Sequence, residues 1–313
     1  MPRVSVIIPT HNRSQLLTGA IESARRAGSD VEIIVVDDAS TDSTAAVCQT
    51  LSGIRYIRLE RNQGVAAARN VGIIASTAEY IAFLDDDDQR LPGSLDLQSE
   101  VLVANPEAGF VCGSVLYANQ SGELTGTIVS PPEGLGGDVF WKLLEWDFFV
   151  LPVAVLIRKA CLYRVGLINS HLSHIDDWDL FVRLAELFQV GVISHPVGIY
   201  RLPTPFSAQT TSNLAPDFIR ALRRQRQLFR LPRVATAPVS KRKEVRRRTL
   251  NRFADILFCQ AATRLPEGAY RFACENFLTG LRLSPQRAVR PYIYKELWQS
   301  FSAQRKRGKM TGV

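Results

Sequence analysis

The chain has 313 residues, 46% of them hydrophobic, and a formal net charge of +8. Its length and composition predict a globular protein with one large domain and an appendage. Its apolar stretches fall far short of the roughly 20 residues of a membrane helix, so we expect neither a transmembrane helix nor a signal peptide. The five cysteines lack CxxC spacing, which argues against a zinc site and predicts reduced thiols in a cytoplasmic protein.

The charge is unevenly distributed along the chain. Residues 1–215 contain 15 basic and 24 acidic side chains, a net charge of −9, whereas residues 216–313 contain 23 and 6, a net charge of +17. We therefore expect two regions, a domain at residues 1–210 and a basic helical region at residues 211–313. Such a tail is typical of proteins that meet phosphate at a membrane surface or on another polyanion. A solvated helical surface is the alternative.

Strand and helix patterns alternate in the first part of the chain. Apolar runs and helical spacing predict strand 4–8, helix 14–27, strand 31–36, a helix capped by 40–43 and ending at 51, strand 54–59, helix 65–76 and strand 80–84. This alternation predicts a parallel sheet covered by helices.

The remaining segments follow with less regularity. The predicted elements are helix 91–104, strand 109–117, a turn-rich excursion over 119–137, strand 150–158, helix 159–166, helix 176–187 and strand 190–200. From residue 216 the pattern changes to long Arg-rich helices, and we place the domain boundary between residues 205 and 216.

Polar residues cluster directly after three of the predicted strands. The clusters are residues 9–12, 37–38 and 85–88. In open α/β sheets, ligands bind outside the carboxyl ends of the strands. The three clusters can therefore converge on one site.

Four consecutive carboxylates, residues 85–88, end a short apolar strand and form the strongest single signal. Adjacent acids repel one another, so the fold needs a cation or hydrogen-bond donors to offset the repulsion. Oxygen ligands indicate Mg²⁺ or Mn²⁺, and such an ion commonly takes further ligands from substrate phosphates. The run therefore favours a phosphorylated substrate such as a nucleotide. A solvated acidic turn is the alternative.

Five motifs together resemble the family 2 glycosyltransferases. Four of them are residues 4–13 (VSVIIPTHNR), 34–42 (IVVDDASTD), 62–72 (NQGVAAARNVG) and 85–88 (DDDD). The fifth, residues 176–183 (DDWDLFVR), resembles the acidic base motif of that family in the expected order. The motifs extend over residues 4 to about 205. The resemblance implies a GT-A nucleotide-sugar fold with a mostly parallel sheet, a divalent cation (Mn²⁺ or Mg²⁺) and inversion at the anomeric carbon.

The resemblance also implies a donor site. Its residues would be the loop Pro9, Thr10, His11, Asn12 and Arg13 around the nucleoside, Asp38 accepting the uracil imide N–H, Arg69 reaching the base or diphosphate, and Gly64 together with Gly72 allowing close backbone approach. A carboxylate acceptor at Asp38 favours a uracil or thymine base, so a UDP-sugar is the expected donor.

In the acidic run, Asp85-x-Asp87 matches the DxD motif of the family. The resemblance makes Asp87 the direct metal ligand, and Asp85 or Asp86 the contact to the ribose or to a metal-bound water. The extra acid leaves the choice between Asp85 and Asp86 open.

On the acceptor side, the resemblance makes Asp177 the general base that takes the proton of the attacking hydroxyl. Asp176 stands where the family commonly has Glu and could position the base, while Trp178 could stack on a sugar face. Acids that stabilise a helix N-terminus are the alternative for this segment.

The leading hypothesis is an inverting glycosyltransferase that acts in cell-surface polysaccharide or glycolipid synthesis. A sugar-phosphate nucleotidyltransferase would have a Gly-rich loop where residues 9–13 have none. A non-catalytic polyanion-binding protein would depend on the basic residues 241–248; nucleic acid is the weaker partner, because no aromatic platform accompanies them. The simplest combination is an enzyme on the inner face of the membrane, docked by its basic tail, with a sugar, lipid-linked or polysaccharide acceptor.

Overall fold

The computed structural model describes residues 3–148, 150–172, 174–202, 214–265, 268–291, 293 and 295. The chain divides into two compact units. The first contains Met1–Leu143 and Phe148–Thr210, and the second contains Leu144–Asp147 and Thr211–Val313. The second unit thus includes four residues from the middle of the region that the sequence assigns to the first domain.

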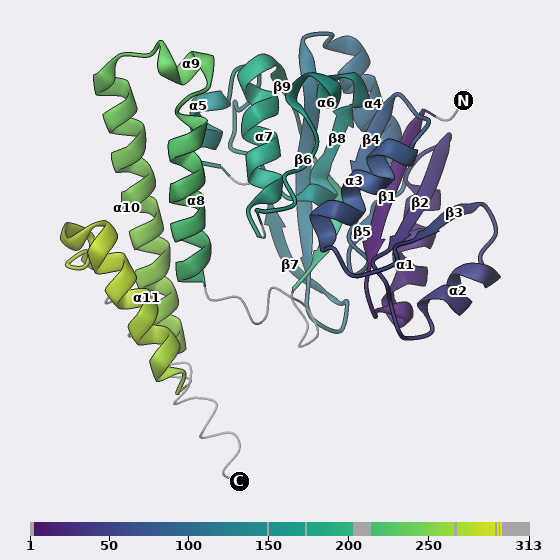
Figure 1. The fold of residues 1–313 in the computed structure, drawn as a ribbon, viewed down its shortest axis with the longest axis horizontal. Coiled ribbons are helices and arrows are strands. Elements are labelled where there is room, and N and C mark those ends of the chain that lie inside the picture. Colours follow the sequence, from purple (N-terminus) through teal and green to yellow (C-terminus); the bar gives the residue numbers. More distant parts are fainter. Residues whose placement is uncertain are drawn as a thin grey trace. The chain divides into compact units, whose positions relative to one another are not determined.

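Within the described residues, the first unit is built on a nine-stranded sheet (Figure 1). Its strands are β1 (Val4–Thr10), β2 (Val31–Asp37), β3 (Ile54–Arg58), β4 (Tyr80–Phe83), β5 (Gln89–Arg90), β6 (Ala108–Ala118), β7 (Leu124–Val129), β8 (Val155–Arg158) and β9 (Gln189–Arg201). Its helices are α1 (Ser14–Arg26), α2 (Thr44–Thr50), α3 (Val65–Ala75), α4 (Ser94–Ala104), α5 (Phe140–Leu144, which continues into the second unit), η1 (Pro152–Ala154), α6 (Lys159–Val165) and α7 (Asp176–Leu187).

The strands run in the order β3-β2-β1-β4-β8-β6-β9-β5, with β7 paired to β6. The first four pair in parallel, as predicted. Strand β8 is antiparallel to both β4 and β6, so the complete sheet is mixed. The carboxyl ends of β1, β2 and β4 lie side by side, and this adjacency brings the three polar clusters to one edge.

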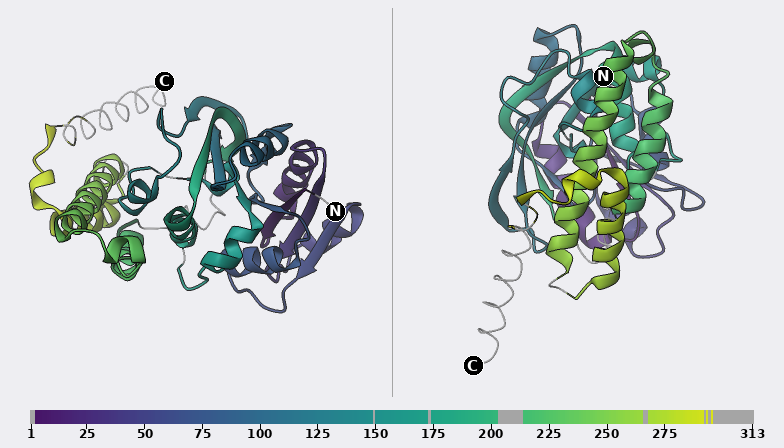
Figure 2. Two further views of the ribbon diagram at one scale, coloured as in Figure 1. Left: turned by 90° about the horizontal axis from the view of Figure 1, so that it is seen from above. Right: turned by 90° about the vertical axis from the view of Figure 1, so that its left-hand side faces the viewer.

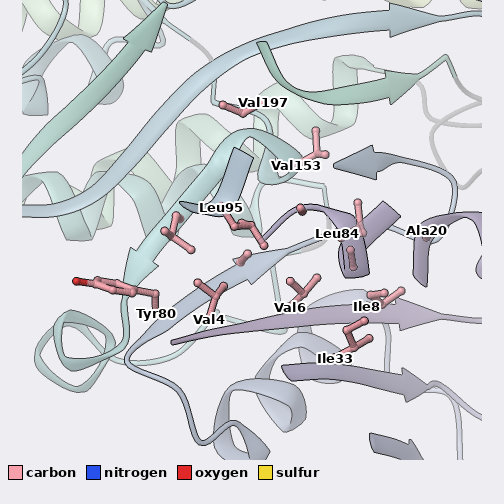
Figure 3. Packing of buried hydrophobic residues seen from close by; sticks show 14 of the residues in the cluster. Val4, Val6, Ile8, Ala20, Ile33, Tyr80, Leu84, Leu95, Val153 and Val197 are labelled. Atoms are coloured by element: carbon pink, nitrogen blue, oxygen red, sulfur yellow. The ribbon is translucent and has the colours of Figure 1, made fainter. Parts of the chain in front are cut away.

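Strand β1 is buried over its whole length because helices cover both faces of the sheet. Val6 and Ile8 belong to the main core cluster together with Leu17, Ala20 and Ile21 of α1, and Figure 3 labels Val6, Ile8 and Ala20 in it. Ile7 lies on the opposite face of the strand and contacts α3. The continuous apolar run of β1 is therefore the pattern of a strand covered on both sides.

Two predicted segments differ in the structure. The strand expected over 150–158 is regular only from Val155, because Pro152 begins a 3-10 turn. The excursion expected over 119–137 contains β7, whose six residues are all exposed. Strand β7 pairs with β6 and buries neither of its faces. Its sequence therefore has no alternation of buried apolar and exposed polar residues, which is the pattern that predicts a strand.

The second unit contains the helices α8 (Leu214–Leu228), α9 (Pro232–Ala235), α10 (Val239–Arg264) and α11 (Tyr270–Leu283), followed by η2 (Pro285–Arg287). Figure 2 shows α10 and α11 side by side. They form an antiparallel hairpin in which the ring centroids of Phe258 and Phe277 lie 5.3 Å apart. The hydroxyl of Ser284 donates a hydrogen bond to Asn251 Oδ1 at 2.7 Å. Phe218 of α8 stacks on Phe253 of α10 with ring centroids 4.2 Å apart. Among the described residues, no helix is long and apolar enough to cross a membrane.

Candidate active site

The loop after β1 is tied to the acidic run after β4. Thr10 Oγ1 donates to Asp86 Oδ2 at 2.7 Å, and Arg13 Nη1 lies 2.8 Å from both Asp86 Oδ1 and Asp87 Oδ2. Parallel pairing of β1 with β4 places the two loops next to each other. Pro9 and Thr10 are buried at the end of the strand.

The same loop is tied to the segment after β2. His11 Nδ1 donates to the Asp38 carbonyl at 2.7 Å, and Asn12 Oδ1 accepts from the Thr41 amide at 2.7 Å. Asn12 and Ala39 both have left-handed backbones, with φ of 55° and 60°. Such conformations cost energy outside glycine and tend to cluster at functional sites. The exposed side chains of His11 and Asn12 thus lie on a loop whose backbone conformation is held by hydrogen bonds.

Asp38 holds the start of helix α3. Its side chain is buried, and its two oxygens accept from the backbone amides of Gln63 and Gly64, each at 2.7 Å. Gly64 has φ of +88°, a conformation that favours glycine. The sequence did not reveal this task of Asp38. Its contact to a uracil base remains a prediction, for which each carboxylate oxygen keeps a second lone pair.

The four acids of the run occupy different environments. Asp86 and Asp88 are buried, whereas the side chains of Asp85 and Asp87 are 29% and 13% exposed. Burial raises the pKa of Asp86 to about 7, although Arg13 and Thr10 favour its charged form. Burial and the neighbouring Asp85 also raise the pKa of Asp87, against the attraction of Arg13. The neighbouring carboxylates of the run therefore repel one another, and a bound cation would reduce this repulsion.

Asp88 belongs to the scaffold, a distinction that the uniform run hides. Its Oδ1 accepts from the Arg201 amide of β9 at 2.9 Å. Two residues on, Arg90 is buried and donates to Gln98 Oε1 at 2.7 Å and to the Val155 carbonyl at 2.6 Å. Burial lowers the pKa of Arg90 to about 9. These contacts anchor the end of the run to α4, β8 and β9.

Arg69 of α3 links the acidic run to helix α7. Its Nη2 donates to Asp85 Oδ1 at 2.5 Å, and its Nη1 lies 3.6 Å from Asp176 Oδ2. Burial alone would lower the pKa of Arg69, but the charges of Asp85, Asp176 and Asp177 outweigh it and raise the pKa. Arg69 is only 5% exposed, so these pairs are poorly screened by water.

Asp177 lies in the first turn of α7 and is half-buried. Its Oδ1 accepts from the Trp178 amide at 2.7 Å. Burial and the neighbouring Asp176 raise the pKa of Asp177 to about 7, whereas Arg69 lowers it. A carboxylate with a pKa near neutrality is matched to the work of a general base.

Asn70, the residue after Arg69, positions the approach to α7 and was missed from the sequence. Its side-chain amide donates to the Ile168 carbonyl at 2.8 Å and accepts from the Ile168 amide at 2.9 Å. This paired contact fixes the loop that leads to Asp177. Its sequence signal is only its place beside Arg69, since the partner is 98 residues away.

One expectation is wrong. Trp178 cannot stack on a sugar as placed, because it is 3% exposed and donates its ring N–H to the Leu143 carbonyl at 2.8 Å. A Cβ at Gly72 would overlap with Cγ2 of Ile7, so this glycine allows close approach of α3 to β1, and its part in donor binding stays a prediction.

Two carboxylates of the run already converge on one positive charge, the guanidinium of Arg13. Across the ranges that the structure describes, no three His, Cys, Asp or Glu side chains gather as a complete metal cage. A magnesium-type ion needs only one or two protein carboxylates when substrate phosphates complete its shell. The oxygen donors of the run fit such an ion.

The architecture is that of the GT-A glycosyltransferases. The crystal structure of Staphylococcus aureus TarS 1-349 superposes with a TM-score of 0.62 over 99% of this chain and 92% of that one, at 16% identity. The TarS 1-349 complex with UDP-GlcNAc gives 0.55 over 90% and 89% at 15% identity. At such identities the likeness establishes the fold.

The family follows from the sequence comparison. The model of glycosyl transferase family 2 matches residues 5–170, and the chain belongs to this family. This membership favours glycosyl transfer over the nucleotidyltransferase and non-catalytic alternatives.

Individual relatives cover different shares of the chain. An uncharacterized glycosyltransferase of Rickettsia felis is 29% identical over 64% of this chain and 33% of its own length, so the chain spans about a third of that protein. A Campylobacter jejuni GalNAc(5)-diNAcBac-PP-undecaprenol beta-1,3-glucosyltransferase is 40% identical over 40% of this chain and 43% of its own. Escherichia coli WfaP, a UDP-Glc:alpha-D-GlcNAc-diphosphoundecaprenol beta-1,3-glucosyltransferase, is 32% identical over 57% of this chain and 68% of its own.

Proposed function

We propose that the protein is an inverting glycosyltransferase that moves a sugar from a UDP-sugar to a hydroxyl of a lipid-linked acceptor. The observation that carries the proposal is the chain of ion pairs from Asp85 through Arg69 to Asp176. It brings the acidic run and the candidate base, Asp177, into one electrostatic unit. An enzyme that transfers a sugar from a diphosphate leaving group to an acceptor hydroxyl needs both parts together.

The substrate classes are supported by the names of related proteins. The Campylobacter and Escherichia relatives are named for acceptors carried on a diphosphate-linked undecaprenol. The Escherichia relative is named for UDP-Glc, and TarS has been solved with UDP and with UDP-GlcNAc. These names favour a UDP-sugar donor and an acceptor held at the membrane, where this protein would act peripherally on the cytoplasmic face.

The donor end of the site would use the loop after β1 and the acidic run. The exposed His11 and Asn12 would contact the nucleoside, and Asp38 would accept the imide N–H of uracil. Asp87, with Asp85 or Asp86, would hold Mn²⁺ or Mg²⁺. When bound, such an ion offsets the negative charge of the leaving diphosphate.

The acceptor end would use Asp177. Its carboxylate takes the proton of the acceptor hydroxyl as the acceptor oxygen forms a bond to the anomeric carbon. The bond from that carbon to the diphosphate breaks, and its electron pair leaves with UDP. Because attack and departure lie on opposite sides of the carbon, one displacement inverts its configuration. Asp176, held by Arg69, would position this base.

The test is a panel of nucleoside-diphosphate sugars, scored by thermal shift and by slow donor hydrolysis with and without Mn²⁺. We expect one UDP-sugar to stabilise the wild type in a metal-dependent way, and this effect to disappear in Asp87→Ala. Asp177→Asn should retain binding and lose turnover by about 10²- to 10⁴-fold. Glu100→Gln, an exposed carboxylate of α4, is the matched control and should behave as the wild type. Turnover retained in Asp177→Asn would remove Asp177 from the role of base.

A further inference from the structure

Helix α10 carries cations whose surroundings differ from one face to the next. On one face, Lys241 and Arg248 lie 3.6 and 3.1 Å from the carboxylate oxygens of Glu145, and Arg252 pairs with Asp147. Both acids come from the short segment Leu144–Asp147, which belongs to the same unit. These cations therefore have a structural task, the attachment of that segment.

A second face carries Lys243, Arg246 and Arg247. Their spacing of three and four residues places them on one side of a helix. Within the part of the chain that the structure describes, none of the three forms a hydrogen bond or an ion pair. The same helix thus separates neutralised cations from unneutralised ones.

These three cations line a defined pocket of about 310 Å³. Its remaining walls include the apolar side chains of Leu250, Leu283 and Pro285. The turn that carries Pro285 is fixed to α10, because Ser284 donates to Asn251 at 2.7 Å and Arg287 pairs with Asp255. The pocket is therefore part of the packed helical hairpin rather than a chance gathering of long side chains.

The electrostatics of the pocket favour an anion. Arg246 is half-buried, and its burial together with the nearby Arg226 lowers the pKa of Arg246. Both effects disfavour the charged guanidinium, and a bound anion would offset both.

We propose that this pocket binds the phosphate of an anionic phospholipid headgroup and thereby docks the second unit on a membrane. Cations beside apolar side chains match a phosphate joined to an apolar body. Val239, one helical turn before Lys243, is 56% exposed and extends the apolar character along the same face. Among the residues that the structure describes, no aromatic ring lines the pocket, and the stacking platform typical of nucleic-acid binding is not formed by them. This proposal rests on the proposed function in one respect: the proposed acceptor is held at a membrane.

The test is sedimentation of the full chain with vesicles of phosphatidylcholine alone and of phosphatidylcholine with phosphatidylglycerol. The pocket variant Lys243→Gln/Arg247→Gln changes two exposed residues and should fold normally. We expect its affinity for the anionic vesicles to fall roughly 30-fold, since each cation near such a surface contributes about 1 kcal/mol. The control Arg271→Gln/Arg282→Gln removes the same charge from exposed positions of α11 outside the pocket. Its loss of binding free energy should be less than a third of the loss in the pocket variant.

Three outcomes would overturn the proposal. Equal losses in the pocket variant and the control would indicate diffuse attraction. Binding of inorganic phosphate at the pocket, without binding of anionic vesicles, would make it a site for a soluble phosphate. Tighter, pocket-dependent binding of a short RNA than of vesicles would assign it to nucleic acid. Donor-dependent thermal shifts on the same proteins report separately on the proposed function, and the pocket variant should retain the wild-type shift.

Discussion

Arg69 donates a hydrogen bond to Asp85 at 2.5 Å, and this contact joins helix α3 to the acidic run after β4. The same guanidinium lies 3.6 Å from Asp176 on α7. One buried cation is therefore shared by the candidate donor end and the candidate acceptor end of the site. Changes in Arg69 should affect both ends at once.

Replacement of Arg69 by Gln should destabilise the fold and change the pH dependence of transfer. Loss of one partner of a buried ion pair costs about 3–5 kcal/mol, measurable by urea unfolding. Because Arg69 lowers the pKa of Asp177, its removal should raise that pKa and move the acid limb of kcat/KM to higher pH. Arg69→Lys keeps the charge and should show a smaller displacement. The exposed Arg61→Gln is the control, and an acid limb unchanged in Arg69→Gln would argue against electrostatic coupling to the base.

Transfer by the wild type should increase as the pH rises through about 7. The pKa of Asp177 is raised to about 7, and a general base works only when deprotonated, so activity is present above this pKa and is lost as the pH falls below it. The profile of kcat/KM against pH reports this ionisation in the free enzyme. An acid limb near pH 4, the ordinary range of a carboxylate, would contradict the assignment.

Replacement of Arg13 by Gln should tighten metal binding. Arg13 Nη1 lies 2.8 Å from Asp87 Oδ2, so a cation bound by Asp87 must compete with this pair. A partly buried pair of this kind is worth about 1 kcal/mol, which corresponds to a gain of roughly fivefold in Mn²⁺ affinity. Isothermal titration calorimetry with Mn²⁺ in the absence of donor measures this affinity. Weaker Mn²⁺ binding in Arg13→Gln would show that Arg13 organises the carboxylates rather than competing for them.

Gly72→Ala should destabilise the first unit through packing. Its Cβ would meet the Ile7 side chain, with 2.3 Å to Cγ2, and overpacking of this kind costs about 1–3 kcal/mol. The variant Ile7→Ala lacks both Cγ atoms that the new Cβ would meet, so Gly72→Ala should cost less in an Ile7→Ala background than in the wild type. Thermal unfolding of the single and double variants measures the difference. A Gly72→Ala protein with wild-type stability and weakened donor binding would favour a ligand contact over the packing role.

The sequence by itself determined the parts of the protein that depend on local pattern. The buried run of β1, the helix spacing of α1 and α3 and the polar clusters after the strands predicted the parallel half of the sheet and the convergence of the loop after β1 with the acidic run, where Thr10 donates to Asp86. The five motifs also indicated the family, because their order along the chain is a property of the sequence.

Only the tertiary structure decided how the acids and cations are shared. Arg69 meets an acid 16 residues away and another on α7, Asn70 meets Ile168 across 98 residues, and Asp88 turns toward the backbone of β9. The sequence does not show which of the four aspartates are buried, and in it Trp178 looks as accessible as any helix residue. Burial and long-range pairing separate them, since the pKa and the exposure of a side chain depend on neighbours that the fold supplies.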